Sequence, residues 1–124
     1  MRVLVVEDVE DAREMYRHFF DFHGMDVATA PDGQAALQAV SVARPDVIVL
    51  DLAMPRMTGW EVIRSLKGRA RTRDIPILAV SGVGTAHSAL DAGADGFLEK
   101  PCLPDRLLAE VLRVTRAGTP SPGA

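Results

Sequence analysis

The alternation of short apolar runs with amphipathic segments is the feature that most restricts how this chain can fold. Runs rich in Val, Ile and Leu occur at residues 2–6, 25–29, 46–50, 76–80 and 96–99. Strands that alternate with helical segments in this way build a parallel sheet with helices on both faces. The third and fourth runs show no alternation with polar residues, which predicts central strands that are buried on both sides. We therefore expect a doubly wound α/β domain.

Apolar residues at helical spacing and terminating signals predict the helices between these strands. The first covers about residues 10–23, up to Gly24, the second follows the turn at 31–33, the third begins after Thr58 and ends at Gly68, and the last covers 104–115. The inward stripes are Ala12, Met15, Tyr16, Phe19 and Phe20 in the first helix, and Leu107, Leu108, Val111 and Leu112 in the last.

The segment between Ser81 and Lys100 leaves little room for a fourth helix. Gly82 and Gly84 loosen its start, and Gly93 must stop it, so only about residues 86–92 remain, with Thr85 as a possible cap. A helix of two turns with so little to bury should be marginally stable and mobile.

Composition excludes several classes of protein. The chain has 124 residues, of which 48% are apolar and 25% are charged, as in a soluble globular domain. Cys102 is the single cysteine, which excludes a disulfide scaffold. No apolar run approaches the ~20 residues of a membrane span, so we expect a cytoplasmic location without membrane contact. A net charge of −3 offers no field to hold nucleic acid, and we expect no nucleic-acid partner for this chain alone.

Side chains that can carry out chemistry stand at the ends of four predicted strands. Glu7 and Asp8 follow the first strand, Asp51 the third, Ser81 the fourth and Lys100 the fifth. Because the carboxyl ends of parallel strands meet at one edge of a sheet, these groups should converge. Three carboxylates repel one another and favour proton binding unless a cation offsets them, and oxygen ligands suit Mg2+. The set holds no histidine or cysteine, which argues against zinc.

These residues belong to longer motifs with a known pattern. The acid pair at 7–8, the run DLAMPRMTG at 51–59, Ser81, and the run AGADGFLEKP at 92–101 resemble response-regulator receiver domains of two-component signalling. The resemblance covers residues 1 to about 116. It implies a receiver domain over 1–116 with a flavodoxin-like (βα)5 fold, a five-stranded parallel sheet in the order 2-1-3-4-5 and a cis Lys100–Pro101 peptide bond. Residues 117–124 are expected to be a disordered tail or the start of a linker.

The resemblance also implies a phosphoacceptor and a metal site. Asp51 would accept a phosphoryl group from the phosphohistidine of a histidine kinase or a phosphotransfer protein, which gives an acyl phosphate. Asp8 and Asp51 would bind Mg2+, which Mn2+ can replace, with the backbone carbonyl of Ala53 as a third ligand and Glu7 acting through water. The domain would assist only its own phosphorylation and dephosphorylation, and would not be an enzyme in the ordinary sense.

Two groups of residues would hold the phosphoryl group and transmit its presence. Lys100 would pair with the phosphoryl oxygens, and the Ser81 hydroxyl would donate a hydrogen bond to one of them. Ser81 and Phe97 would then switch the surface that a downstream protein target recognises. In the family the fourth helix, fifth strand and last helix commonly form the partner face. The short fourth helix here predicts partner contacts nearer the first helix and the loops around Asp51.

Other functions compete with this one. A phosphohydrolase of the haloacid dehalogenase type also uses a strand-end aspartate, but residues 7–10 lack its Asp-x-Asp pattern. A nucleotide- or flavin-binding domain needs a glycine-rich first turn, whereas residues 7–11 are acidic. Ser81 lacks the Gly-x-Ser-x-Gly pattern of serine hydrolases. A degenerate receiver that serves only as a scaffold is disfavoured because all the phosphorylation residues are present.

Two questions are left open by the sequence. The module can be a stand-alone shuttle, a phosphorelay intermediate, or part of a larger hybrid kinase or regulator. The three arginines within residues 69–73 can contact an acidic partner, but their pattern favours a solvated connection.

Overall fold

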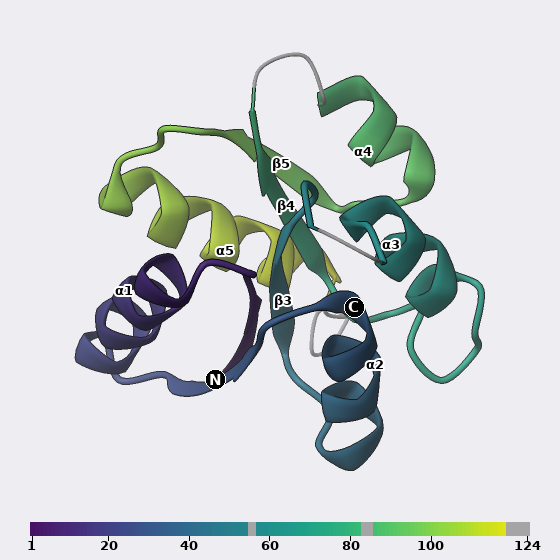
Figure 1. Ribbon diagram of the computed structural model, residues 1–124, viewed down its shortest axis with the longest axis horizontal. Helices are drawn as coiled ribbons and strands as arrows, with labels where there is room; N and C mark the ends of the chain where they lie inside the picture. The colour runs from purple at the N-terminus through teal and green to yellow at the C-terminus, as the bar shows by residue number, and fades with distance from the viewer. Residues whose placement is uncertain (55–56, 83–85, 119–124) are drawn as a thin grey trace.

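The computed structural model describes residues 1–54, 57–82 and 86–118. Strands and helices alternate along the whole of this part of the chain (Figure 1). They are β1 (Arg2–Val6), α1 (Glu10–Phe22), β2 (Asp26–Ala30), α2 (Gly33–Val42), β3 (Val47–Asp51), α3 (Gly59–Lys67), β4 (Ile77–Ser81), α4 (Ala86–Ala92), β5 (Gly96–Glu99) and α5 (Pro104–Gly118).

The five strands form one parallel sheet in the order β2-β1-β3-β4-β5, which confirms the predicted fold. Helices α1 and α5 cover one face of the sheet, and α2, α3 and α4 cover the other (Figure 1). The chain order reverses between β1 and β3, and this is where ligands bind in sheets of this kind. Every residue of β3 and β4 is buried, as expected for central strands.

Local signals place most helix ends where the sequence predicts them. The Thr58 hydroxyl accepts a hydrogen bond from the backbone N–H of Glu61 at 3.3 Å and caps α3, which ends before Gly68. Gly24 has a φ of 78° and ends α1 in a conformation that side chains with a Cβ rarely adopt. The fourth helix has seven residues and Gly93 follows it with a φ of 116°, so its predicted shortness is confirmed.

Three strands lie one residue later than predicted. The prediction ended β3 and β4 at their last apolar residue, but Asp51 pairs with Val80 and Ser81 pairs with Glu99. Backbone pairing does not depend on the polarity of a side chain, so a strand continues through a polar residue at the sheet edge. Strand β2 is shifted in the same way and ends at Ala30.

The last helix departs from its prediction on both face and length. It buries Leu107, Val111 and Val114, whereas Leu112 is 38% exposed, so the prediction that Leu112 faces the core was wrong. The buried positions are four and three residues apart and form one stripe, from which Leu112 is displaced by about one position. Helix α5 also runs to Gly118 rather than ending near residue 115. The tail at 119–124, Thr85 as a cap and Gly84 lie outside the described residues.

Candidate functional site

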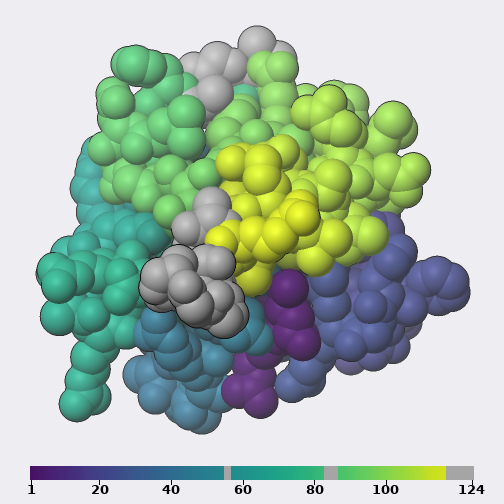
Figure 2. Space-filling model, turned by 180° about the vertical axis from the view of Figure 1, so that it is seen from behind, coloured from purple at the N-terminus to yellow at the C-terminus, as the bar shows by residue number. Residues whose placement is uncertain are grey.

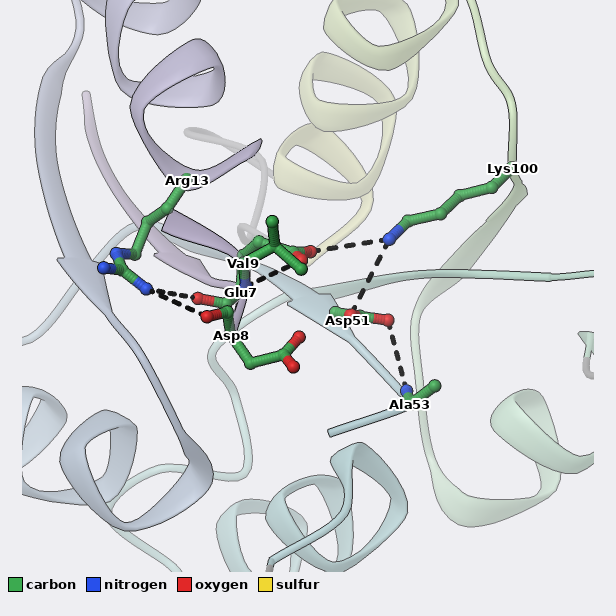
Figure 3. Close-up of polar contacts among 7 residues, drawn as sticks. All are labelled: Glu7, Asp8, Val9, Arg13, Asp51, Ala53 and Lys100. Carbon is green, nitrogen blue, oxygen red and sulfur yellow. Dashed lines mark hydrogen bonds and ion pairs between the residues drawn. The ribbon is translucent and has the colours of Figure 1, made fainter. Parts of the chain in front are cut away.

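The carboxyl ends of the strands bring the predicted polar side chains to one edge of the sheet. Glu7 follows β1, Asp51 ends β3, Ser81 ends β4 and Lys100 follows β5. Figure 3 shows the carboxylates of Asp8 and Asp51 turned towards the same space, with Lys100 reaching in from the β5 side. The convergence predicted from strand ends is present in the structure.

Three carboxylates form the centre of this edge. One oxygen from each of Glu7, Asp8 and Asp51 lies within 4.8 Å of the other two. Glu7 and Asp51 are only 2% and 6% exposed, and Asp8 is half-buried. All donors are hard oxygen atoms, and buried like charges at this separation need a cation to offset them. The donor set therefore fits Mg2+, which takes one or two carboxylates and keeps water in its remaining positions.

Among the residues that the structure describes, Lys100 brings a positive charge to these acids. Its Nζ lies 3.4 Å from Glu7 Oε2 and 3.6 Å from Asp51 Oδ2. The backbone N–H of Lys100 donates to the carbonyl oxygen of Ser81 at 2.7 Å, which fixes the start of the side chain beside the end of β4. The Lys100–Pro101 peptide bond is cis, as the resemblance implies.

The pKa values of Glu7 and Lys100 are shifted by burial and by the neighbouring charges. Burial raises the pKa of the Glu7 carboxyl, and the neighbouring Asp51 charge raises it further, against the opposing effect of Lys100. Burial alone would lower the pKa of the Lys100 ammonium, but the charges of Asp51 and Glu7 outweigh burial and the pKa is raised. Lys100 is therefore a permanent cation at neutral pH, whereas the ionised form of Glu7 is disfavoured.

Backbone amides hold two of the carboxylates in place. The N–H of Ala53 donates to Asp51 Oδ1 at 3.1 Å, and the N–H of Val9 donates to Glu7 Oε1 at 3.3 Å. The other Asp51 oxygen faces Lys100 (Figure 3). Each carboxylate is thus oriented by its own loop before any ligand arrives.

Arg13 is a residue of the site that the sequence analysis missed. Its Nη1 donates to the carbonyl oxygen of Glu7 at 2.9 Å and to that of Asp8 at 3.5 Å (Figure 3). The guanidinium therefore holds the turn that carries the acid pair, without pairing with either carboxylate. The available signal was a basic residue about one turn into α1, which many helices show.

Ser81 lies at the end of β4, and Phe97 lies within β5. Ser81 is buried at the end of β4, one residue beyond the residue that pairs with Asp51. Phe97 of β5 pairs with Ala79 of β4. Its side chain is half-buried and packs against the core between the sheet and helices α2 to α4. Their roles, like the Ala53 carbonyl as a ligand, stay predictions. Residues 55–56 of the 51–59 motif lie outside the described residues.

An apolar groove borders the carboxylate cluster. It has a volume of about 540 Å3 and lies between α1 and the segment that joins β5 to α5. Its lining residues are Ala12, Met15, Tyr16, Phe19, Lys100, Pro101, Cys102, Pro104 and Leu107. Lys100 belongs to both features, so the groove opens beside the reactive edge.

A family model describes this arrangement. The model of the response regulator receiver domain matches residues 3–112, which is most of the chain. This chain belongs to the response regulator receiver domains. The chain is therefore a receiver domain of two-component signalling. Receiver domains interact with histidine kinases and downstream effectors. As a signalling domain it is not an enzyme of the classical kind.

Curated relatives are longer than this receiver domain. It is 42% identical over 127 residues to the response regulator MprA of Mycolicibacterium vanbaalenii, covering 100% of this chain and 54% of that protein. It is 41% identical over 127 residues to MprA of Mycobacterium leprae, covering 100% of this chain and 55% of that protein. The chain thus spans about half the length of the curated relatives it matches.

Solved structures of similar proteins share the fold. The chemotaxis protein CheY4 of Vibrio cholerae aligns with a TM-score of 0.85 at 35% identity, covering 91% of this chain and 97% of that one. The signal receiver domain of a histidine kinase from Syntrophus aciditrophicus aligns with a TM-score of 0.88 at 30% identity, covering 97% and 93%. Within the described part of the chain, no helix has the length and apolar character needed to cross a membrane.

Proposed function

We propose that Asp51 is the phosphoacceptor of this receiver domain and that a histidine kinase or a phosphotransfer protein supplies the phosphoryl group. One observation carries the proposal: Asp51 ends the central strand β3 within the acid cluster, where it faces Lys100 at 3.6 Å and accepts an orienting N–H from Ala53. Glu7 has similar contacts, but burial and the Asp51 charge raise the pKa of its carboxyl, which makes it the poorer nucleophile. A hydroxyl nucleophile needs a base to take up its proton, whereas a carboxylate attacks through an oxygen without one, so no separate base is required.

The transfer requires little more than position and charge. An Asp51 oxygen forms a bond to phosphorus while the bond from phosphorus to the histidine nitrogen breaks, and the nitrogen keeps the electron pair. The second nitrogen of the donor ring carries a proton throughout, so the ring leaves as a neutral imidazole and the product on Asp51 is an acyl phosphate. Phosphoryl transfer of this kind is limited by alignment and by neutralisation of the phosphoryl charge. Lys100 meets part of that need, since its Nζ already lies between Glu7 and Asp51.

Mg2+ is the cofactor that we propose for the acid cluster. Asp8 and Asp51 would hold it together with the Ala53 carbonyl, and Glu7 would act through water; Mn2+ can replace it. When bound, the ion neutralises the charge that the phosphoryl group adds to the site. The chain itself contributes the donor oxygens within 4.8 Å and the Arg13 contacts that hold the turn carrying Glu7 and Asp8.

The phosphorylated state would be recognised through Ser81, Lys100 and Phe97. We infer that Lys100 pairs with the phosphoryl oxygens and that the Ser81 hydroxyl donates to one of them, which draws the end of β4 towards Asp51. Phe97 is half-buried in the edge strand β5, so a change in its packing would change the exposed surface. A downstream protein target would then bind the altered surface.

The apolar groove beside Lys100 is the docking surface that we propose for the phosphodonor protein. A donor must bring its phosphohistidine to Asp51, so it must also cover the surface around that residue. The groove begins at Lys100, and Met15 at its border is 60% exposed. Helix α4, with seven residues, offers a much smaller surface.

Mass spectrometry after incubation with acetyl phosphate tests the phosphoacceptor. The wild type should gain one phosphoryl group in millimolar Mg2+ and none in EDTA, whereas Asp51→Asn should gain none in either. The exposed Asp21→Asn is the matched control and should behave as the wild type. Labelling that survives Asp51→Asn would defeat the assignment, and equal labelling in EDTA would defeat the role of the metal.

A further inference from the structure

A second cavity lies at the opposite edge of the sheet from Asp51. It has a volume of about 400 Å3 and lies between the end of α2, the end of α3 and the loop from α3 to β4. Figures 1 and 2 show this loop beside α2. Arg44 precedes β3 and the loop precedes β4, so the cavity lies at the amino ends of these strands. Its volume falls in the range of small-molecule sites.

This cavity, which we name the arginine cavity, has an apolar wall and a basic rim. Leu37 and Val40 of α2 and Leu66 of α3 form the wall, and the rim carries Arg44, Arg69 and Arg71. None of its described lining residues is an aspartate or a glutamate. Within the described residues, none of these three guanidinium groups has a carboxylate oxygen within 4.0 Å.

The backbone that carries two of these arginines is held by specific hydrogen bonds. The carbonyl oxygen of Arg69 accepts from the N–H of Thr72 at 3.1 Å, and the Thr72 hydroxyl donates to the Leu66 carbonyl at 2.6 Å. Across the cavity, Nη1 of Arg44 donates to the carbonyl oxygen of Arg71. These bonds give the loop a defined backbone conformation, while Arg69, Arg71 and Arg73 are exposed, as predicted for a solvated connection.

Charge and shape together indicate the ligand. Three cations around one cavity repel one another, and an anion between them would turn that repulsion into attraction. A guanidinium matches phosphate oxygens with paired hydrogen bonds. The apolar wall suits a ring or carbon skeleton attached to that phosphate. We propose that the arginine cavity binds a phosphate-bearing small molecule of nucleotide size, with its phosphate at the arginines and its apolar part on the wall.

Isothermal titration calorimetry on the full chain at constant ionic strength tests this site. The probes are AMP, GMP, CMP and UMP, with adenosine and inorganic phosphate as partial ligands. At least one nucleotide should bind saturably, and adenosine and inorganic phosphate should each bind more weakly. Arg44→Gln and Arg71→Gln should each weaken nucleotide binding about tenfold or more, which corresponds to about 1.4 kcal/mol. Arg64→Gln removes the same charge from an exposed position of α3 outside the cavity and should leave binding unchanged.

Several outcomes would overturn the proposal. One is a Kd weaker than about 1 mM for all four nucleotides. Another is an equal loss of affinity in Arg44→Gln and Arg64→Gln, which would indicate unspecific attraction to a basic surface. If adenosine bound as tightly as AMP, the phosphate would contribute nothing to binding and the proposal would be wrong. A polyglutamate peptide that binds where no nucleotide does would assign the cavity to an acidic protein segment instead.

Discussion

Replacement of Glu7 by glutamine is expected to stabilise this receiver domain when no divalent ion is present. Oxygens of Glu7, Asp8 and Asp51 lie within 4.8 Å of one another, and at an effective dielectric constant of about 20 each pair repels by about 3.5 kcal/mol. The attraction between Glu7 Oε2 and Lys100 Nζ at 3.4 Å contributes about 5 kcal/mol in the opposite direction on the same scale. The two repulsions that involve Glu7 thus outweigh its one attraction.

The net cost of the Glu7 charge is about 2 kcal/mol on this scale, before the cost of burial is added. Part of the repulsion between Glu7 and its neighbour Asp8 persists in the unfolded chain, which lowers the difference. Glutamine keeps the shape of the side chain and removes the charge. We therefore expect Glu7→Gln to raise the free energy of unfolding by about 1–2 kcal/mol in EDTA at neutral pH.

The pH dependence of stability also indicates that the charge of Glu7 destabilises the folded state. The pKa of Glu7 in the folded protein is raised above its ordinary value of 4.5 by burial and by Asp51. The folded state therefore holds this proton more tightly than the unfolded state does. The resulting stabilisation is fully present below pH 4.5 and is lost as the pH rises through the higher folded pKa. The difference in stability between Glu7→Gln and the wild type should grow over that window.

Urea denaturation followed by circular dichroism measures the effect. With a slope of about 2 kcal/mol per molar urea, the midpoint of Glu7→Gln should lie about 0.5–1 M above that of the wild type in EDTA. Glu99→Gln, the same change at an exposed position at the end of β5, should change stability by less than about 0.5 kcal/mol. Mg2+ should stabilise the wild type more than Glu7→Gln. A lower midpoint for Glu7→Gln in EDTA would show that the attraction to Lys100 dominates, and would refute the reasoning.

Three further predictions concern the elements around the site. Lys67→Met should lower the free energy of unfolding by about 2–3 kcal/mol in urea titrations, because its ammonium donates to two backbone carbonyls and to Asp95; a loss no larger than that of Arg64→Met would contradict this. Gly59→Ala should cost about 1–3 kcal/mol and slow the labelling of Asp51 by acetyl phosphate, because the new methyl would lie 2.5 Å from the Cα of Leu52. Amide protons of α4 should exchange much faster than those of α3, and equal protection would disprove its marginal stability.

Much of the fold and of the site could be predicted because both depend on patterns that run along the chain. Apolar runs mark the strands, and parallel strands must place their carboxyl ends at one edge, so Asp51, Ser81 and Lys100 converge without any knowledge of side-chain packing. Strand ends were less predictable, since Asp51 and Ser81 still pair through their backbones. The inward face of α5 was also misassigned at Leu112, because leucine at adjacent stripe positions does not reveal which stripe meets the sheet.

Arg13 shows why part of the site could not be predicted. Its guanidinium binds the carbonyl oxygens of Glu7 and Asp8, and every residue has a carbonyl. The contact depends on how the turn between β1 and α1 directs those carbonyls, which is a property of the folded backbone. The arginine cavity has the same character, because Arg44 reaches the backbone of Arg71 across the gap between two helices.

The apolar stripe of α1 connects the pattern in the sequence with the surface beside the site. The stripe predicts a helix buried along its length, yet Phe20 is its one fully buried member, and Met15 is 60% exposed. A sheet face shared with α5 cannot cover so wide a stripe, so its outer part borders the groove that begins at Lys100. A group of exposed apolar side chains on the surface of a folded protein commonly marks a site of interaction with a partner. Because α4 offers only seven residues on the opposite side of the sheet, this surface of α1 is where we expect protein partners to bind.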